Sequence, residues 1–145
     1  MELRDTFERV IDYMRISITD RCNLRCVYCM PESGVKLFEH KDILTYEEII
    51  RVADIAASLG VRKIRLTGGE PLIRKNVSYL IASLKAIKGI EDISLTTNGI
   101  LLEKHASVLA DAGLNRINIS LDTLRPDRYR EITRGGDITP VLRGI

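Results

Sequence analysis

The sequence predicts an α/β fold, a partial (βα) barrel of the TIM type with about four βα units, parallel strands and helices outside. Segments with the apolar–polar alternation of strands take turns along the chain with segments of helical periodicity. The connections between them are short, as in βαβ units, which build parallel sheets. Four units over residues 14–145 come to about 33 residues each, close to the roughly 31 residues per unit of a complete eight-fold barrel. The chain therefore has the length of half a barrel.

Each element follows from a local pattern. The expected strands are, in order, Met14–Thr19, Lys63–Thr67, Ile93–Asn98 and Arg116–Asp122. The first helix begins after Thr45, because Thr45 and Glu48 have capping-box spacing, and it ends near Gly60. Apolar residues at helical spacing predict the other helices over 77–87, over 102–110 and from Pro126 past Ile132.

The last residues carry the start of another helix. Thr139 is expected to cap this helix and Pro140 to take its first position. Only five residues follow Pro140, whereas an isolated helix needs about 12–15 residues to be even marginally stable in water. We therefore interpret residues 1–145 as the N-terminal part of a barrel whose chain continues, within this helix, past Ile145.

The composition is that of a folded globular domain and excludes several classes of protein. Of the 145 residues, 45% are hydrophobic and 29% charged, and the net charge is +2, which excludes disordered and fibrous chains. The charges are too evenly balanced for a nucleic-acid-binding surface. No apolar run approaches the roughly 18 residues of a membrane span, and the charged N-terminal residues lack the apolar core of a secretory signal. We expect a cytoplasmic protein with no membrane or nucleic-acid partner.

Each expected strand has one apolar and one polar face. Parallel strands that are covered on both faces are normally apolar throughout, and a sealed core would not tolerate so many polar groups without partners. We therefore expect the polar faces to line a shared, solvent-accessible lumen that holds a polar ligand. Arg15, Lys63 and Arg65 give this lumen cations that suit an anionic or phosphorylated substrate. The alternative is that such cations pair with acids, for example Glu70 and Asp122.

Three cysteines lie directly after the first strand, in residues 22–30 (here called the cysteine loop). Cys22, Cys26 and Cys29 have C-x3-C-x2-C spacing. An odd, tightly clustered set is a poor disulfide framework and is more typical of a metal site in a reducing compartment, where thiolates bind iron–sulfur clusters or zinc. Structural zinc takes four ligands, and only the distant His40 is left to add one, so a zinc-stapled interaction module is the alternative from another class. Three ligands on a four-iron cluster would instead leave one iron open for a small molecule.

This loop, just beyond the carboxyl end of a barrel strand, resembles the signature of the radical S-adenosylmethionine (SAM) superfamily. The resemblance implies that Cys22, Cys26 and Cys29 hold a [4Fe-4S] cluster whose open iron binds SAM. It also implies that an electron donor drives cleavage of SAM to a 5′-deoxyadenosyl radical. No catalytic side chain is assigned beyond the cluster and SAM. The SAM contacts that the resemblance implies are Gly68, Gly69 and Glu70 of the Gly-Gly-Glu-Pro turn, Tyr28 in the cysteine loop and Ser120 after the fourth strand.

Longer segments resemble one family within this superfamily, the GTP 3′,8-cyclases of molybdenum-cofactor biosynthesis. These segments are 12–23, 29–31, 63–72, 95–99, 118–122, 132–135 and 141–145. The resemblance implies a lyase that binds SAM and GTP, with Arg15, Arg65 and Thr96 contacting GTP. It further implies a second [4Fe-4S] cluster from a later part of the protein, and it leaves a homodimer open. A peptide-modifying maturase shares the cysteine and glycine motifs and is the alternative within the superfamily, but the two lumen arginines favour a phosphate-bearing substrate.

Overall fold

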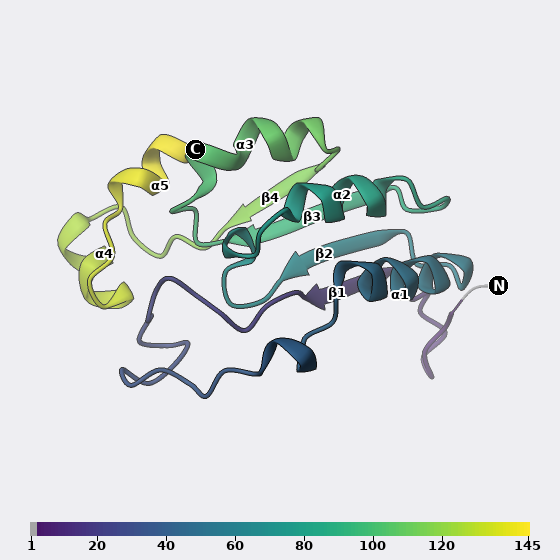
Figure 1. Cartoon of the computed structure of the whole chain (residues 1–145), viewed down its shortest axis with the longest axis horizontal. Coiled ribbons are helices and arrows are strands. Elements are labelled where there is room, and N and C mark those ends of the chain that lie inside the picture. Colours follow the sequence, from purple (N-terminus) through teal and green to yellow (C-terminus); the bar gives the residue numbers. More distant parts are fainter. Residues whose placement is uncertain (1–2) are drawn as a thin grey trace.

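The computed structural model describes residues 3–145 and contains a four-stranded parallel sheet (Figure 1). Its strands lie side by side in chain order. All four arrows in Figure 1 point toward the end of the sheet where the long loop after the first strand lies. Parallel strands that alternate with helices confirm the predicted α/β architecture. The strands are β1 (Tyr13–Ser17), β2 (Lys63–Thr67), β3 (Asp92–Thr97) and β4 (Arg116–Ile119).

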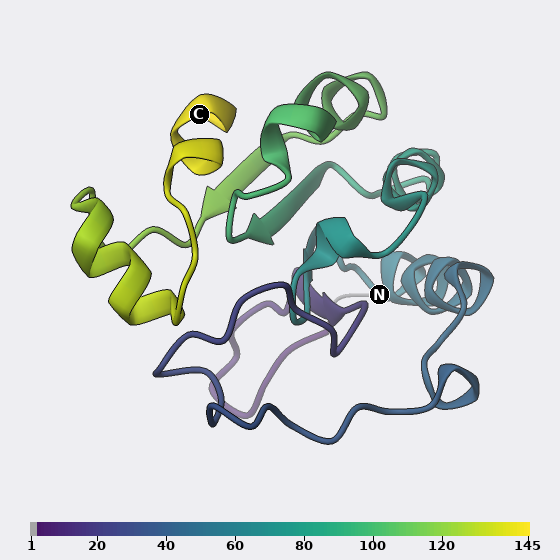
Figure 2. The same cartoon turned by 60° about the vertical axis from the view of Figure 1, so that its left-hand side comes forward.

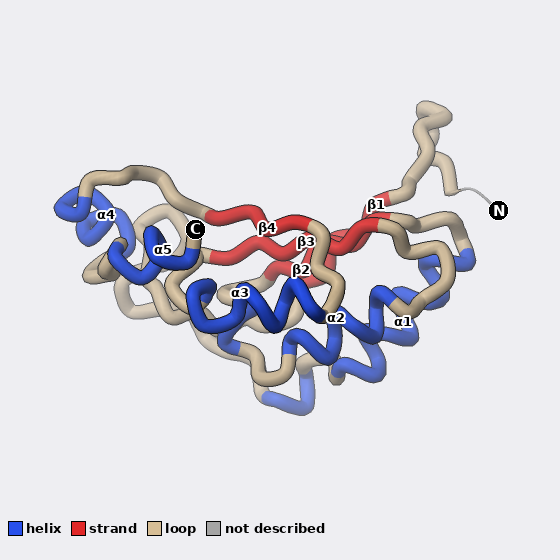
Figure 3. Tube along the Cα trace, turned by 90° about the horizontal axis from the view of Figure 1, so that it is seen from above, coloured by secondary structure: helices blue, strands red, loops and turns tan. Residues whose placement is uncertain are grey.

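The three longest helices that the structure describes all lie on one face of the sheet (Figure 3). Because every crossover places its helix on the same side, the sheet winds in one direction, as it does in a barrel. The other face is left open by residues 3–145. None of the described helices is long and apolar enough to cross a membrane. The helices are α1 (Tyr46–Ser58), α2 (Val77–Lys85), α3 (Leu102–Asp111), α4 (Pro126–Thr133) and α5 (Thr139–Gly144), with short 3-10 helices η1 (His40–Asp42) and η2 (Pro71–Ile73).

The hydrophobic core lies between the covered face of the sheet and the helices. Ile64 and Leu66 of β2 are 1% and 0% exposed, and Ile93 and Leu95 of β3 are both 0% exposed. Successive side chains in a strand point to opposite faces, so the polar residues between these core positions point to the open face. The predicted division of the strands into an apolar and a polar face is therefore confirmed. The helices contribute Ile49, Ala53, Leu80, Ile81, Leu84, Leu102 and Leu109 to the same core.

β1 and β4 are shorter than the sequence predicts. The alternation of apolar and polar residues predicts strands as far as Thr19 and Asp122, but the strands end at Ser17 and Ile119. Beyond β1, the Thr19 carbonyl accepts a hydrogen bond from the Gly69 amide (2.7 Å) in the turn after β2. An alternating pattern therefore does not fix where a strand ends, because it can continue past the last residue that pairs with a neighbouring strand.

The predicted helix ends are confirmed at α1 and corrected at α5. Thr45 Oγ1 accepts from the Glu48 amide (3.2 Å), and Glu48 Oε2 accepts from the Thr45 amide (2.7 Å), which completes the expected capping box. Gly60 follows this helix with a left-handed φ of 107°. α5 begins at Thr139 itself instead of after it, and the side chain of Asp137 accepts from the Thr139 amide (2.9 Å).

Candidate functional site

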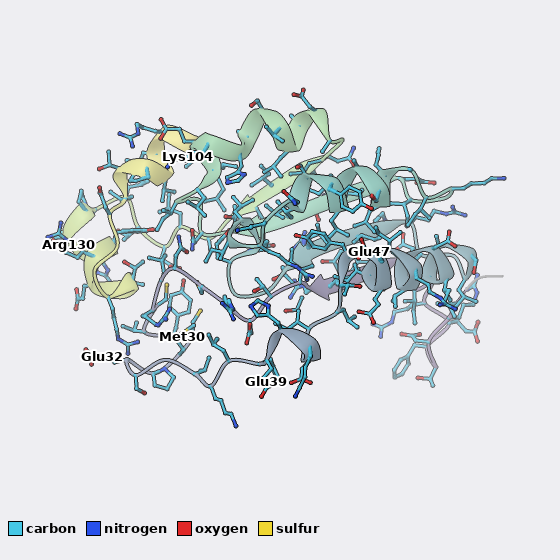
Figure 4. The ribbon with its side chains drawn as sticks, viewed as in Figure 1. Met30, Glu32, Glu39, Glu47, Lys104 and Arg130 are labelled. Carbon is cyan, nitrogen blue, oxygen red and sulfur yellow. The ribbon has the colours of Figure 1, made fainter. Side chains whose placement is uncertain are left out.

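The cysteine loop lies beyond the carboxyl end of β1, beside α4 (Figure 2). The Val27 amide donates to the Ile132 carbonyl (2.9 Å), and the Arg134 guanidinium donates to the Met30 carbonyl (2.8 Å). Figure 4 labels Met30 in the loop and Arg130 on the helix that supports it. Sequence reasoning placed α4 in the fold but missed its role as a support for the loop. The only signal for it is the Arg-Gly-Gly run that ends α4, where Arg134 takes a left-handed φ of 54°.

The three thiols lie close enough to influence one another. Cys22 and Cys26 are half-buried, and Cys29 is exposed. Burial raises the pKa of the Cys26 thiol, and the charges of Cys29 and Cys22 raise it further. The pKa of Cys29 is also raised, first by partial desolvation of its thiol group in an otherwise exposed residue and then by the charges of Cys22 and Asp122. Bound metal cations relieve such repulsion and hold coordinating thiols deprotonated, so this donor set fits a metal centre.

The described residues do not form a ready site for a single metal ion. Within residues 3–145, no three ligating side chains converge on one metal position. The ring of His40, the expected fourth ligand of a zinc module, instead has its Nε2 3.3 Å from a guanidinium nitrogen of Arg21. Each thiolate of an iron–sulfur cluster binds its own iron atom, so the three sulfurs need not meet at one point. The three cysteines are compatible in number and kind with the ligands of such a cluster, and His40 is not placed as a fourth zinc ligand.

A cavity of about 330 Å³ joins the cysteines to the turn after β2. This arrangement brings together two sets of residues that the sequence assigned to one site, the expected cluster ligands and the expected SAM-binding glycines. The cavity opens at the carboxyl end of the sheet, which is where barrel enzymes place their chemistry. Its lining includes Cys22, Cys26, Cys29, Gly68, Gly69 and Ser17.

The two glycines of this turn are required by a close approach of main chain to main chain. A Cβ on Gly68 would lie 2.4 Å from the Thr19 carbonyl oxygen, and one on Gly69 would lie 2.1 Å from that of Arg21. The Gly69 amide donates to the Thr19 carbonyl (2.7 Å). The sequence predicted a close backbone approach here, and the structure shows one, to the segment that leads into the cysteine loop.

The side chain of Glu70 is engaged inside the protein. It is 1% exposed, and its Oε1 accepts from the Leu72 amide (3.0 Å) and the Thr97 hydroxyl (2.7 Å). Its Oε2 accepts from the Asn98 amide (2.7 Å). The considered pairing of Glu70 with a lumen cation is therefore wrong. Any contact between this residue and SAM would come from its main chain, because the carboxylate holds three protein donors.

Asn98 connects the end of β3 to the cysteine loop. Its Nδ2 donates to Asn23 Oδ1 (2.7 Å) and lies 4.0 Å from Cys22 Sγ. The sequence placed Asn98 on the polar side of its strand but gave it no role in the site. No periodic pattern could have found this contact, since the two partners are 75 positions apart in the chain.

The register of the strands places a row of polar residues across the open face. Arg15, Arg65, Ser94 and Arg116 are neighbours in successive strands. Arg65 Nε donates to Ser94 Oγ (3.3 Å), and its guanidinium lies 5.7 Å from the centre of the Tyr13 ring. No hydrogen bond or ion pair within residues 3–145 involves the side chain of Arg15. Two guanidinium groups of this row, those of Arg15 and Arg65, thus face the open side without a carboxylate.

The other cations of the open face are paired with acids. Lys63 Nζ lies 2.7 Å from Asp12 Oδ2, and Arg116 forms an ion pair with Asp92. The hydrogen bond from Lys63 lowers the pKa of the Asp12 carboxyl. The sequence suggested other acids as partners, because the pairing depends on strand register that composition does not reveal. Lys63 therefore differs from the two free arginines, although the sequence grouped all three together.

The remaining expected site residues lie at the carboxyl ends of β3 and β4. The Tyr28 hydroxyl donates to Asp122 Oδ2 (2.8 Å), so Asp122 pairs with no lumen cation. Burial and this bond raise the pKa of Tyr28. Ser120, the residue after β4, is exposed, and its amide donates to the Thr97 carbonyl (2.9 Å). Thr96 is half-buried on the open face, one row nearer the carboxyl ends than the arginines.

Several curated relatives of this chain carry the same name. The model of the radical SAM superfamily matches residues 16–145. A protein named GTP 3′,8-cyclase from Alkaliphilus metalliredigens is 62% identical over 143 residues, which are 99% of this chain and 45% of that protein. One of the same name from Moorella thermoacetica is also 62% identical over 143 residues, 99% of this chain and 44% of that protein. The chain thus spans less than half the length of these relatives.

Solved structures of low sequence identity share the fold. Methylornithine synthase (PylB) matches with a TM-score of 0.65 at 17% identity, over 91% of this chain and 39% of that chain. BtrN, solved in complex with AdoMet and 2-DOIA, matches with a TM-score of 0.63 at 17% identity, over 93% of this chain and 55% of that chain. These likenesses confirm the parallel, partial-barrel architecture. With its superfamily match from residue 16 to residue 145, the chain belongs to the radical SAM superfamily, whose members use a [4Fe-4S] cluster and SAM.

Proposed function

We propose that this chain is the N-terminal part of a GTP 3′,8-cyclase. Such an enzyme is a radical SAM lyase that converts GTP to (8S)-3′,8-cyclo-7,8-dihydroguanosine 5′-triphosphate in the first step of molybdenum-cofactor biosynthesis. The observation that carries the proposal is the 62% identity to proteins of that name over 99% of the chain. The structure supports it with a thiol-lined cavity at the carboxyl end of a parallel sheet and free guanidinium groups on the open face.

Cys22, Cys26 and Cys29 are the proposed ligands of the [4Fe-4S] cluster. When bound there, the cluster and SAM would supply the radical chemistry by which the GTP ribose is joined to the guanine ring. The chain itself positions the cysteine loop. On one side the Val27 amide binds α4, and on the other the turn after β2 binds the residues that lead into the loop. Both supports fix the loop before any ligand binds.

Two of the proposed SAM contacts line the same cavity. Gly68 and Gly69 belong to its wall, and the main chain of Glu70 continues the turn. Tyr28 and Ser120 are not among the residues that line the cavity; they come from the cysteine loop and from the end of β4. Because the hydroxyl of Tyr28 is bound to Asp122, its ring and main chain are the parts available to SAM.

Arg15, Arg65 and Thr96 are the proposed GTP contacts. The two arginines are neighbours in register on β1 and β2, and neither is neutralised by a carboxylate within residues 3–145. Guanidinium groups bind phosphate oxygens in pairs and form strong, charge-assisted hydrogen bonds. Thr96 lies one row nearer the cavity. On the strength of this order, we propose that the triphosphate lies over the arginines and the reacting sugar lies toward the thiols.

Other parts of the proposal concern what lies outside this chain. A later part of the protein is proposed to supply further strands, more ligand contacts and a second [4Fe-4S] cluster that binds the purine. A protein or small-molecule electron donor is a required partner, and a homodimer is left open. We place the protein in the cytoplasm, since its three cysteines are free thiols, as expected in a reducing compartment.

A peptide-modifying radical SAM enzyme is the second candidate that the motifs allow. It would share the cysteine spacing and the Gly-Gly-Glu-Pro turn. Nothing in the open face favours it, because a peptide backbone offers no phosphate to Arg15 and Arg65. The relatives of 62% identity also carry the cyclase name.

Anaerobic reconstitution with iron and sulfide tests the proposed cluster site. We expect the 145-residue chain to take up about four iron atoms and to show the absorbance of a [4Fe-4S] cluster. The variant in which all three cysteines become Ala is expected to take up none. Stoichiometric zinc without iron uptake would contradict the cluster. The complete protein then tests the substrate: with SAM and a reductant, cyclised GTP is expected, and SAM cleavage without any change in GTP would contradict the cyclase assignment.

A further inference from the structure

We propose that Glu70 and Asn98 form a hydrogen-bonded clamp (the Glu70–Asn98 clamp) that positions Cys22 for cluster binding. Asn98 acts in it as a positioning residue and touches neither SAM nor GTP. The inference rests on the proposed function only in taking Cys22 as a cluster ligand. It assigns a different task to Glu70, whose carboxylate becomes part of the scaffold of the site.

The clamp has a rigid base. The Glu70 carboxylate is buried and accepts hydrogen bonds from Leu72, Thr97 and Asn98 at 2.7–3.0 Å. The Thr97 hydroxyl in turn accepts from the Gly99 amide (3.0 Å). A buried network whose members are all satisfied is fixed in position, because any movement would leave a polar group without a partner.

The clamp holds the residues on both sides of Cys22. On one side, the Glu70 amide donates to the Arg21 carbonyl (2.7 Å). On the other side, Asn98 Nδ2 donates to Asn23 Oδ1 (2.7 Å). The ring closes where the Asn98 amide donates to the Glu70 carboxylate (2.7 Å). The three hydrogen bonds and the main chain from Arg21 to Asn23 thus form a closed ring, and Cys22 lies in the part of that ring contributed by the cysteine loop.

Donors also lie near the sulfur itself. The Leu24 amide is 3.5 Å from Cys22 Sγ, and Asn98 Nδ2 is 4.0 Å away. A donor at 4.0 Å is at the outer limit for sulfur, so the main effect of Asn98 is on the position of the loop. Groups that orient metal ligands from outside typically change metal affinity about 10- to 100-fold when removed.

One substitution separates this role from an ordinary structural one. Asn98 Oδ1 accepts from the Ile100 amide (3.1 Å) and so shapes the turn into α3. Asn98→Asp keeps that acceptor, the main-chain bond to Glu70 and the size of the side chain, and it replaces the Nδ2 donor with a negatively charged oxygen. Asn118→Asp makes the same chemical change at an exposed position of β4 whose side chain has no recorded hydrogen bond within the described chain. It controls for an added charge on the sheet, and the uncharged Asn23→Ala variant controls for the charge that Asn98→Asp brings next to the thiols.

The experiment follows iron release from the anaerobically reconstituted holoprotein after a chelator is added. We expect Asn98→Asp to lose iron about 10-fold faster than the wild type, and Asn118→Asp to match the wild type. The melting temperature of the iron-free Asn98→Asp protein is expected to fall by only a few degrees, as for the loss of one hydrogen bond, whereas a purely structural role of Asn98 would predict faster iron loss only in proportion to that fall. The electron paramagnetic resonance spectrum of the reduced cluster is expected to change in Asn98→Asp alone.

A second variant cuts the clamp from the loop side. Asn23 is exposed, so Asn23→Ala endangers folding less, and it is expected to speed iron release as Asn98→Asp does. The double variant should be no faster than either single one, since both remove the same bond. Equal iron release from wild type, Asn98→Asp and Asn23→Ala would overturn the clamp. A wild type that takes up no iron would instead overturn the proposed cluster, so the two failures are distinguishable.

Discussion

The hydroxyl of Tyr28 donates a hydrogen bond to Asp122 (2.8 Å), and the two residues are 94 positions apart in the chain. Tyr28 belongs to the cysteine loop after β1, and Asp122 follows β4. The bond therefore connects the two outer strands of the described sheet at their carboxyl ends. It also leaves the tyrosine protonated, because burial and the neighbouring carboxylate raise its pKa.

The Tyr28–Asp122 bond is expected to make a pH-dependent contribution to stability. The unfolded tyrosine has a pKa of about 10, and the pKa in the folded chain is higher, so the contribution is complete below about pH 10 and is lost as the pH rises above it. Tyr28→Phe should lower the free energy of unfolding by about 0.5–1.5 kcal/mol at pH 8. Urea unfolding at pH 8 and pH 11 measures both proteins. A difference that does not shrink with pH would contradict the bond.

Replacing Arg15 or Arg65 by Ala is expected to weaken GTP binding in the complete protein. A charge-assisted bond to phosphate contributes about 1.5–3 kcal/mol, which corresponds to roughly 10- to 150-fold in affinity. SAM cleavage should persist in both variants. Lys63→Ala is the matched control, because Lys63 is already paired with Asp12, and its effect should be under about threefold. Isothermal titration calorimetry with GTP measures the affinity of each variant. Equal losses of GTP affinity in all three variants would refute the prediction.

Gly69→Ala is expected to disturb the cysteine loop. Its Cβ would lie 2.1 Å from the Arg21 carbonyl oxygen, so the main chain must shift, at a cost of about 1–3 kcal/mol. Iron uptake should fall with the stability. Gly135→Ala is the comparison, since a Cβ there meets nothing within 4 Å and carries only the strain of a φ of 107°. Iron content that falls in Gly135→Ala but not in Gly69→Ala would be the opposite of the expected result.

The free edge of β4 is expected to make the 145-residue chain self-associate or dissolve poorly. Among the described residues, β4 pairs only with β3, and an unpaired edge offers its main-chain groups to another strand. The same chain should show no cyclase turnover, because the proposed purine site lies outside it. Sedimentation at several concentrations and a GTP assay check the two parts. A monomer with full turnover would contradict both.

The sequence was a good guide to everything that repeats along the chain. Alternation located all four strands, and helical spacing with capping residues located the helices, because burial against one sheet face imposes a fixed period on each element. The cysteine spacing likewise predicted a metal-binding loop without any knowledge of the fold, and this stays a prediction. What β1 does after Ser17 was not predictable, since the bond between Thr19 and Gly69 joins two turns and leaves no periodic trace.

The pairing of charges was the other part that the sequence could not settle. Lys63 binds Asp12, which precedes β1, and Arg116 binds Asp92, which begins β3. Each pair depends on which residues become neighbours in register, a property of the assembled sheet. Glu70, which looked available to a ligand, is instead buried with three donors. Distances in the folded chain, not residue types, separate a ligand contact from a structural one.

The acids Asp12 and Asp92 also set how readily this surface could change its preference. Each neutralises one cation of the open face. Removal of either acid would therefore raise the net positive charge of that face. A substitution such as Asp12→Asn would unmask Lys63 without moving any strand, and it would add a third cation below Arg15 and Arg65. A single substitution can thus change the charge of the open face while the thiols and the glycine turn stay as they are.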